Sequence, residues 1–163
     1  MVEIRPATAA DWPAIWPFYQ AIVAAGETYA LPRDISEPEG RAQWMQSPPG
    51  QTFVAVDEGG AVLGSASVYP NRPAAGSHVA SASFMVDPGR GGRGTGRALG
   101  EHVIAWAREQ GYRAMQFNAV VETNERAVAL WRSLGFEVLT TIPEGFAHPT
   151  LGYVGLSVMY RFL

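Results

Sequence analysis

The chain has 163 residues, 47% of them hydrophobic, which is enough for one domain with its own core. It contains no cysteine, which excludes a disulfide scaffold, thiolate catalysis and cysteine-bound metal; it contains no lysine, which excludes a P-loop lysine and a Schiff base. The formal net charge of -3 gives no general attraction to nucleic acid or to an anionic membrane.

The first part of the chain predicts one strand and two helices. Thr8 and Asp11 are candidate N-caps for a helix whose apolar residues recur at helical spacing until Gly26, and Pro17 is expected to kink that helix or delay its start. Pro48-Pro49 should stop the second helix. The expected elements are a strand at 2–4, a helix ending at 25, a loop at 26–37 and a helix at 39–46.

The rest of the chain predicts six strands and two helices. Glu58-Gly59-Gly60 lies between two alternating runs and indicates a hairpin. Gly111 and Gly135 are the expected ends of the two helices, and Thr123 or Asn124 is the expected cap of the second. The expected elements are strands at 51–57, 61–69, 78–86, 112–121, 136–142 and 153–162, with helices before 111 and 135.

The order of these elements predicts the fold class. Three strands in series precede two strand–helix units, which is typical of an α/β (α+β) protein with a mixed sheet rather than of a repeating β-α array. The sequence shows no internal repeat and no linker. We therefore expect residues 1–163 to form a single domain.

A turn rich in glycine and arginine joins the strand at 78–86 to the following helix. Five glycines and three arginines lie between Val86 and Leu99. Glycines allow a tight backbone turn and a close approach to a ligand, and a helix start directs unpaired N–H groups at an anion. A pyrophosphate suits such a turn, with Arg90, Arg93 and Arg97 adding positive charge.

Three other interpretations of the turn are open. It could be a flexible surface loop, although a position between a strand and a helix argues against this. A Walker A loop requires a lysine that is absent. The spacing Gly89-x-Gly91-x-x-Gly94 matches a dinucleotide fingerprint, with Glu122 beyond the next strand, but hairpins rather than β-α-β units precede it.

The segment from Val86-Asp87-Pro88 through Gly96-Arg97-Ala98-Leu99 resembles the acetyl-CoA signature of the GCN5-related N-acetyltransferase (GNAT) family. Residues 4–8 with Asp11 resemble the opening of that family, and residues 124–136 resemble its second block. The resemblance covers essentially the whole chain. It implies a mixed, mostly antiparallel central sheet of about seven strands flanked by about four helices, with acetyl-CoA as co-substrate and no metal.

The resemblance also implies roles for individual residues. The strand ending at Met85 and Val86 would pair with the pantetheine arm, and an N–H at Val86 would stabilise the oxyanion. Asn124 would hold the pantetheine or an ordered water. The residues expected to contact the cofactor are Met85, Val86, Arg90, Gly91, Gly92, Arg93, Gly94, Thr95, Gly96, Arg97, Asn124 and Trp131.

The chain departs from the family pattern at two positions. Gly91 replaces the usual Arg or Gln at the start of the loop, which leaves the backbone amides to bind the phosphates. Trp131 replaces the frequent tyrosine acid, and an indole N–H is a hydrogen-bond donor but not an acid. Either water or another tyrosine, such as Tyr153, would then protonate the thiolate; a core residue is the other interpretation of Trp131.

A narrower resemblance concerns the acceptor. Residues 117–124, 26–29, 69–71 and 77–78 are similar to the branch that contains azetidine-2-carboxylate (proline-analogue) N-acetyltransferases. It implies an amino-acid-like acceptor, with Ser81 standing where that branch has a substrate asparagine. The residues expected to bind the substrate are Glu27, Tyr29, Asn71, His78, Ser81 and Asn118.

Several of these residues have a second interpretation. Asn118 could bind a ligand or neighbouring backbone, and it is expected to share a strand face with Glu122. Glu122 could accept the amine proton, with Asn124 nearby, or be a solvated charge in the first turn of a helix. His78 could be a base or a surface residue. The loop at Glu27 and Tyr29 could be a pocket wall or a plain loop.

Together these observations predict direct transfer of an acetyl group from acetyl-CoA to the amine of a small amino-acid-like acceptor. Two alternatives are a non-catalytic acyl-CoA-binding module, suggested by Trp131, and a nicotinamide-dependent oxidoreductase, suggested by the glycine spacing. The expected partner is a small-molecule amine, with no nucleic acid, no membrane and a possible homodimer. A cytoplasmic location is expected, since residues 1–6 lack a signal-peptide pattern and the apolar stretch at 12–25 is too short to span a bilayer.

Overall fold

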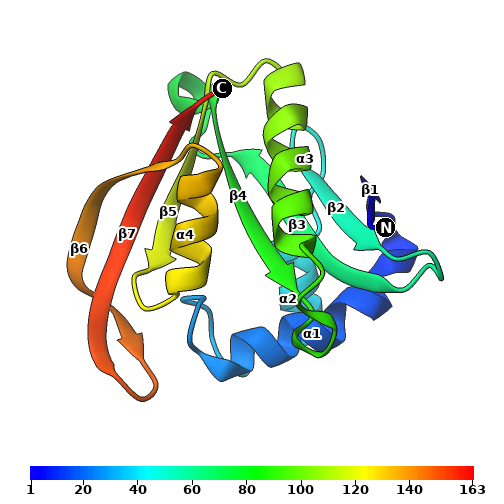
Figure 1. Ribbon diagram of the computed structural model, residues 1–163, viewed down its shortest axis with the longest axis horizontal. Helices are drawn as coiled ribbons and strands as arrows, with labels where there is room; N and C mark the ends of the chain where they lie inside the picture. The colour runs from blue at the N-terminus through cyan, green and yellow to red at the C-terminus, as the bar shows by residue number, and fades with distance from the viewer.

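The computed structural model describes all 163 residues and contains one sheet of seven strands and four α-helices (Figure 1). The strands are β1 (Glu3–Pro6), β2 (Gln51–Val56), β3 (Val62–Pro70), β4 (Val79–Val86), β5 (Ala114–Val121), β6 (Glu137–His148) and β7 (Gly152–Phe162). The helices are α1 (Trp12–Ala25), α2 (Glu37–Trp44), α3 (Thr95–Glu109) and α4 (Glu125–Ser133). The predicted fold class is therefore confirmed.

The strand order in the sheet is β1-β2-β3-β4-β5-β7-β6, and only the β4–β5 pair is parallel. The mixed sheet predicted from the element order is thus observed, and it is mostly antiparallel, as the family resemblance implies. A dinucleotide-binding fold requires repeated parallel β-α-β units. The topology therefore does not favour the oxidoreductase alternative.

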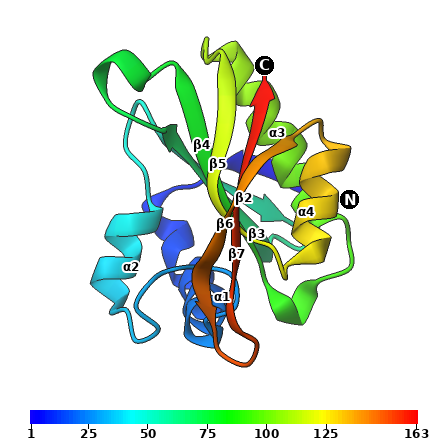
Figure 2. The same ribbon diagram turned by 90° about the vertical axis from the view of Figure 1, so that its left-hand side faces the viewer.

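Helices cover both faces of the sheet (Figure 2). Successive side chains of a strand point to opposite faces, and β2 shows this clearly. Phe53 and Ala55 pack in one core with residues of α3 and α4, whereas Val54 and Val56 pack in a second core with residues of α1 and α2. The central strands are consequently apolar on both faces.

Local signals explain most of the element ends. Gly26 ends α1 in the left-handed region (φ 69°), where glycine avoids the steric cost of a side chain. Pro17 lies inside α1 and does not delay its start. Ser36 and Glu39 form a capping box, so α2 begins at Glu37, two residues before the predicted start.

The largest boundary error concerns β6, which was expected to end at Ile142 and continues to His148. Its register with β7 shifts between Ile142 and Phe146, and most of its side chains are exposed. An exposed, irregular strand lacks the alternation from which strands are predicted. Pro143, Glu144 and Gly145 therefore looked like a loop.

The feature that shapes the site is the separation of β4 from β5. They pair only at Val79–Ala114 and Ala80–Met115, after which β5 pairs with β7 alone. Figure 1 shows the two strands running apart, with α4 beside β5 and α3 beside β4. The open end of this gap lies where β4 leads into the glycine turn.

Candidate active site

A cavity of about 350 Å³ occupies the gap between β4 and β5. Its walls come from β4, the end of β5, the loop after α1 and the first turns of α4. Fourteen of the 19 lining residues are hydrophobic. The cavity is therefore an apolar pocket with a few polar groups, which is typical of small-molecule sites.

The backbone of β4 presents hydrogen-bonding groups to this cavity. The C=O of Val79 and the N–H of Asp87 both bond to the β3 side, so the odd-numbered residues of β4 face β3. Because backbone groups alternate along a strand, Phe84 and Val86 face the gap. No strand pairs with this part of β4 in the gap; the N–H and C=O of Phe84 bond the Tyr29 hydroxyl, and an extended ligand can add there as a strand once that hydroxyl releases them.

Met85 and Val86 contribute to the cavity differently. Both residues line it, but the backbone of Met85 is turned toward β3 by the same alternation. The side chain of Met85 is 2% exposed and packs in the core that contains α1. The backbone groups that face the gap therefore belong to Phe84 and Val86, and Met85 contributes to the cavity only as a lining residue.

The glycine turn lies at the end of β4. Gly92 and Gly94 have positive φ values of 82° and 72°, which explains why glycine stands there. Gly94 is the N-cap of α3 and supplies no side chain, so none caps the first N–H groups of this helix. An added Cβ at Gly91, Gly92 or Gly94 would meet nothing within 4 Å, so the backbone here is open to a ligand.

The side chains of the arginines around the turn are about half exposed, and the ion pairs of Arg90 and Arg93 are long. Arg90 lies 3.5 Å from Asp87, and Arg93 lies 3.9 Å from Asp57 in the β2–β3 turn. Arg97 donates to Ser133 Oγ (2.7 Å) and so links α3 to α4. Exposed ion pairs of this kind are weak. Arg90 and Arg93 can therefore exchange these partners for a phosphate, which fits a coenzyme A pyrophosphate beside the helix start.

The cavity itself holds no formal charge. Its only ionisable lining residues are Tyr29 and Tyr69, and its other polar side chains are hydroxyls and amides from Thr28, Ser81, Ser83, Asn118 and Asn124. Burial raises the pKa of the Tyr29 phenol above its ordinary value. The chemistry inside the cavity is therefore that of neutral hydrogen-bond donors and acceptors.

Asn118 lies at a bulge in β5, where the register with β7 shifts between Phe117 and Val120. Its Nδ2 donates to Asn71 Oδ1 (2.6 Å), and its Oδ1 accepts from Gln116 Nε2 (2.9 Å). The side chain is exposed, lines the cavity and bonds other side chains rather than neighbouring backbone, so a ligand can reach it. Asn71 reaches the site only through Asn118.

Glu122 does not share the cavity face with Asn118, because the bulge breaks the alternation on which that prediction depended. Its Oε1 accepts from the N–H of Gly155 on β7 (2.8 Å), and the residue is absent from the cavity lining. Glu122 thus fastens the end of β5 to the β6–β7 hairpin. Tyr153, considered as an acid, is 72% exposed on β7 and also lies outside the lining.

Asn124 and Trp131 both line the cavity from α4. Asn124 Oδ1 accepts from the N–H of Ala127 (3.4 Å), so this residue, rather than Thr123, caps the helix. The Trp131 ring lies 4.6 Å from the Phe84 ring and 4.9 Å from the Phe117 ring, measured between centroids. Trp131 is also part of the main core, and at 7% exposed it forms an apolar wall.

Three of the predicted substrate residues lie outside the cavity: Glu27, His78 and Asn71, which meets it only through Asn118. Glu27 is exposed and is not among the lining residues, although Thr28 and Tyr29 are. His78 is exposed and lines a separate hollow at the other end of β4, with Trp106 and Tyr112. The expectation that His78 belongs to the acceptor pocket is therefore wrong.

The structure adds residues that sequence reasoning did not select. Phe84 and Phe117 line the cavity, as do Tyr69 and Ser83, whose hydroxyl oxygens lie 3.5 Å apart. Alternation along β4 could have placed Phe84 beside Val86, since both are even-numbered. No group of three or more His, Cys, Asp or Glu residues is arranged to hold a metal ion.

An unpaired strand edge, an apolar cavity and an anion-binding helix start along one line define a binder of an extended, phosphate-bearing ligand. Residues 12–136 match the model of the acetyltransferase (GNAT) family. The chain belongs to this family, whose members are acyltransferases that use acetyl-CoA as co-substrate. The residues present fit that ligand: Phe84 and Val86 would face its pantetheine arm and the glycine turn its pyrophosphate.

Individual relatives agree with this assignment. A GCN5-related N-acetyltransferase from Kribbella flavida is 58% identical, with a TM-score of 0.97, and the match covers 99% of this chain and 98% of that one. A phosphinothricin acetyltransferase from Sinorhizobium meliloti, solved with acetyl-CoA, is 26% identical with a TM-score of 0.89 and coverage of 99% and 88%.

A curated relative matches over a shorter stretch. The N-acetyltransferase aca1 of Schizosaccharomyces pombe is 31% identical over 88 residues, which is 54% of this chain and 42% of that protein. The match thus spans less than half of this relative's length. None of the four α-helices combines the length and the hydrophobicity that crossing a lipid bilayer requires. The cytoplasmic location and the homodimer stay predictions.

Proposed function

We propose that the protein transfers an acetyl group directly from acetyl-CoA to the amine of a small amino-acid-like acceptor. The observation that carries this proposal is the uncharged cavity of about 350 Å³ beside the unpaired edge of β4. The similarity to the aca1 N-acetyltransferase supports transfer to nitrogen, and the similarity to a phosphinothricin acetyltransferase supports a small amine as acceptor.

The neutral lining agrees with the reaction. An amine attacks a thioester only in its uncharged form, and an apolar cavity disfavours the ammonium form by desolvation. The amides of Asn118 and Asn124 and the hydroxyls of Ser81 and Ser83 remain to orient the acceptor, including a carboxylate. Holding the amine beside the thioester carbon supplies much of the rate by proximity.

The chain's own groups bind and orient the reactants more than they move protons. The N–H groups of Phe84 and Val86 face the gap and can bond the pantetheine arm and the thioester carbonyl. As the C–N bond forms and the C–S bond breaks, one proton leaves the amine nitrogen and one joins the thiolate. Glu122 is held by Gly155 and Trp131 is not an acid, so we propose that water carries both protons.

A thiol-release assay over a panel of amines tests the proposal. The panel contains azetidine-2-carboxylate, other proline analogues, phosphinothricin, methionine sulfoximine, ordinary amino acids, polyamines and short peptides, with a reaction lacking acceptor as the control for hydrolysis. We expect thiol release above the control with one or more small amino-acid-like amines. Turnover with peptides or polyamines alone would contradict the acceptor class.

The same assay addresses the binding-module alternative. A non-catalytic module would bind acetyl-CoA, and so raise the melting temperature of the protein by mass action, without releasing thiol for any amine. Thermal melting with acetyl-CoA is therefore run beside the assay. Stabilisation by acetyl-CoA together with no thiol release over the whole panel would favour the module.

A further inference from the structure

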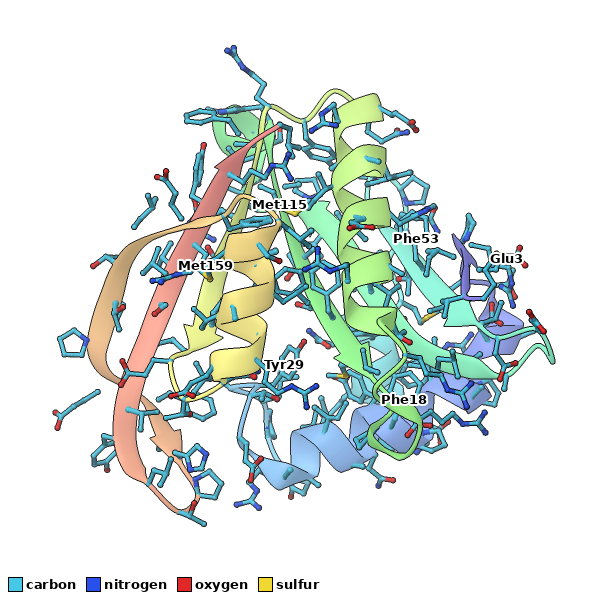
Figure 3. The ribbon with its side chains drawn as sticks, in the orientation of Figure 1. Glu3, Phe18, Tyr29, Phe53, Met115 and Met159 are labelled. Atoms are coloured by element: carbon cyan, nitrogen blue, oxygen red, sulfur yellow. The ribbon has the colours of Figure 1, made fainter.

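One polar contact in the cavity joins two distant parts of the chain. The hydroxyl of Tyr29, in the loop after α1, donates to the C=O of Phe84 (2.5 Å) and accepts from the N–H of the same residue (3.1 Å). The two residues are 55 positions apart in the sequence. Figure 3 labels Tyr29 at the lower end of the gap, beneath α4.

This contact marks a specific point on the unpaired edge of β4. The N–H and C=O of Phe84 face the gap, where no strand of the sheet can pair with them. Unpaired backbone groups in an apolar cavity are costly, and the phenol satisfies both. The hydroxyl therefore stands where the polar group of a bound ligand would meet β4.

The phenol can also donate to a ligand without moving its ring. Its hydrogen rotates about the C–O bond, so it can turn from the Phe84 carbonyl to another acceptor. Phe84 N and Tyr29 Oη lie 3.1 Å apart. This N–H donates to the hydroxyl oxygen in the free protein, so a carbonyl oxygen that accepts from both donors must take the N–H from the hydroxyl as the phenol hydrogen turns toward it.

We propose that the Tyr29 hydroxyl and the Phe84 N–H together bind the thioester carbonyl oxygen and stabilise the oxyanion that forms on it, which makes Tyr29 a catalytic residue. The inference rests on the acetyl transfer proposed above. When the amine attacks, the C=O π electrons move onto this oxygen; they return when the C–S bond breaks. Tyr29 keeps its proton throughout and only strengthens its hydrogen bond.

The environment of Tyr29 suits a neutral donor. Burial raises its pKa, so the phenol stays protonated at any pH at which the enzyme would work. Tyr69 also lines the cavity, but its hydroxyl is nearest to Ser83, whose backbone faces β3. Of the two tyrosines in the cavity, only Tyr29 has its hydroxyl on the open edge of β4.

The test compares Tyr29→Phe with the wild-type chain, with Tyr112→Phe in the separate hollow as a matched loss of a phenol hydroxyl. We expect Tyr29→Phe to lower kcat about 100-fold or more, as loss of one oxyanion donor does. The KM for acetyl-CoA should change less than about threefold, because this donor acts mainly in the transition state. The pH profile should keep its shape, and Tyr112→Phe should behave like the wild type.

A measurement on bound ligand accompanies the kinetics. The carbonyl stretch of [¹³C-carbonyl]acetyl-CoA, recorded by infrared difference spectroscopy without acceptor, should move to lower frequency on binding to the wild type and move less in Tyr29→Phe. An unshifted band in the wild type would overturn the proposal even if the variant did not fold. A Tyr29→Phe variant with unchanged kcat and tighter acetyl-CoA binding would also overturn the proposal. The phenol would then only occupy, in the free protein, the position on Phe84 that the ligand takes.

These outcomes separate the inference from the proposed function. If the wild type releases no thiol with any amine, the proposed function fails. If the wild type turns over and Tyr29→Phe matches it in kcat and in the carbonyl band, only the role of Tyr29 fails.

Discussion

The two ends of the proposed ligand site differ in exposure and in charge. The glycine turn is exposed at residues 89–94 and carries arginines and helix N–H groups, whereas the cavity between β4 and β5 is lined without any charged side chain. An anion that stays in contact with water is bound well by exposed positive charge and backbone N–H groups. A cavity without charged side chains favours the uncharged form of the amine, which is the form that the reaction needs. Changes at one end should therefore affect cofactor binding, and changes at the other should affect the acceptor or the chemistry.

Among changes that test this difference between the two ends, a substitution at Gly94 is expected to have the largest effect. Replacement by valine forces a β-branched residue into a left-handed conformation at the start of α3 and displaces the first N–H groups of the helix. We expect the Kd for acetyl-CoA to rise about tenfold or more. Isothermal titration calorimetry measures this. Gly111→Val, at an equally open position with φ 90°, is the matched control for strain alone. An equal loss of affinity for acetyl-CoA in both variants would show that strain alone weakens binding, and would contradict the role of the glycine turn in binding the cofactor.

Asn118→Ala should affect the other end. The substitution removes an amide that lines the cavity and bonds Asn71, so we expect the KM of the acceptor to rise about fivefold. The Kd for acetyl-CoA should stay within a factor of about two. Steady-state kinetics with each substrate varied separates the two quantities. Gln116→Ala is the control, because Gln116 bonds Asn118 but does not line the cavity; a larger effect there would contradict the assignment.

The pH dependence of kcat/KM should be set by the pKa of the acceptor amine rather than by a titrating group of the protein. No carboxylate or histidine lines the cavity, and the raised pKa of Tyr29 keeps the phenol protonated. The value of kcat/KM should thus rise with pH as the amine loses its proton, and the midpoint should differ between acceptors by the difference in their amine pKa values. Profiles for two acceptors about one pKa unit apart check this. A common midpoint would reveal a titrating group of the protein.

The smallest effect is expected at Arg93. Its side chain is 58% exposed and lies 3.9 Å from Asp57, so Arg93→Ala should weaken acetyl-CoA binding only about two- to threefold at low salt. The difference from wild type should vanish at high ionic strength, because exposed charges are screened. Arg108→Ala, near the other end of α3, is the control. A salt-independent loss at Arg93 would show that its charge is buried in the complex.

Features of the fold that depend on neighbouring residues were predicted from the sequence, whereas features that depend on contacts between distant residues were not. The hairpin at residues 58–60, the stop at Gly26 and the cap at Asn124 are local features, and each lies where it was predicted. The site required contacts that the sequence does not show. The bond between Glu122 and Gly155 spans 33 positions and that between Tyr29 and Phe84 spans 55. The β5 bulge reversed the expected face of Glu122, and no local pattern announces a bulge of one residue.

The central claim is that the acetyl group enters the gap between β4 and β5 at the point where Phe84 faces it. A crystal structure of the chain with acetyl-CoA tests this most directly. We expect the thioester oxygen to lie within hydrogen-bond distance, about 2.7–3.2 Å, of Phe84 N, with the pyrophosphate against the amides of the glycine turn. A thioester placed outside the cavity, with the Tyr29–Phe84 contact unchanged, would contradict the claim.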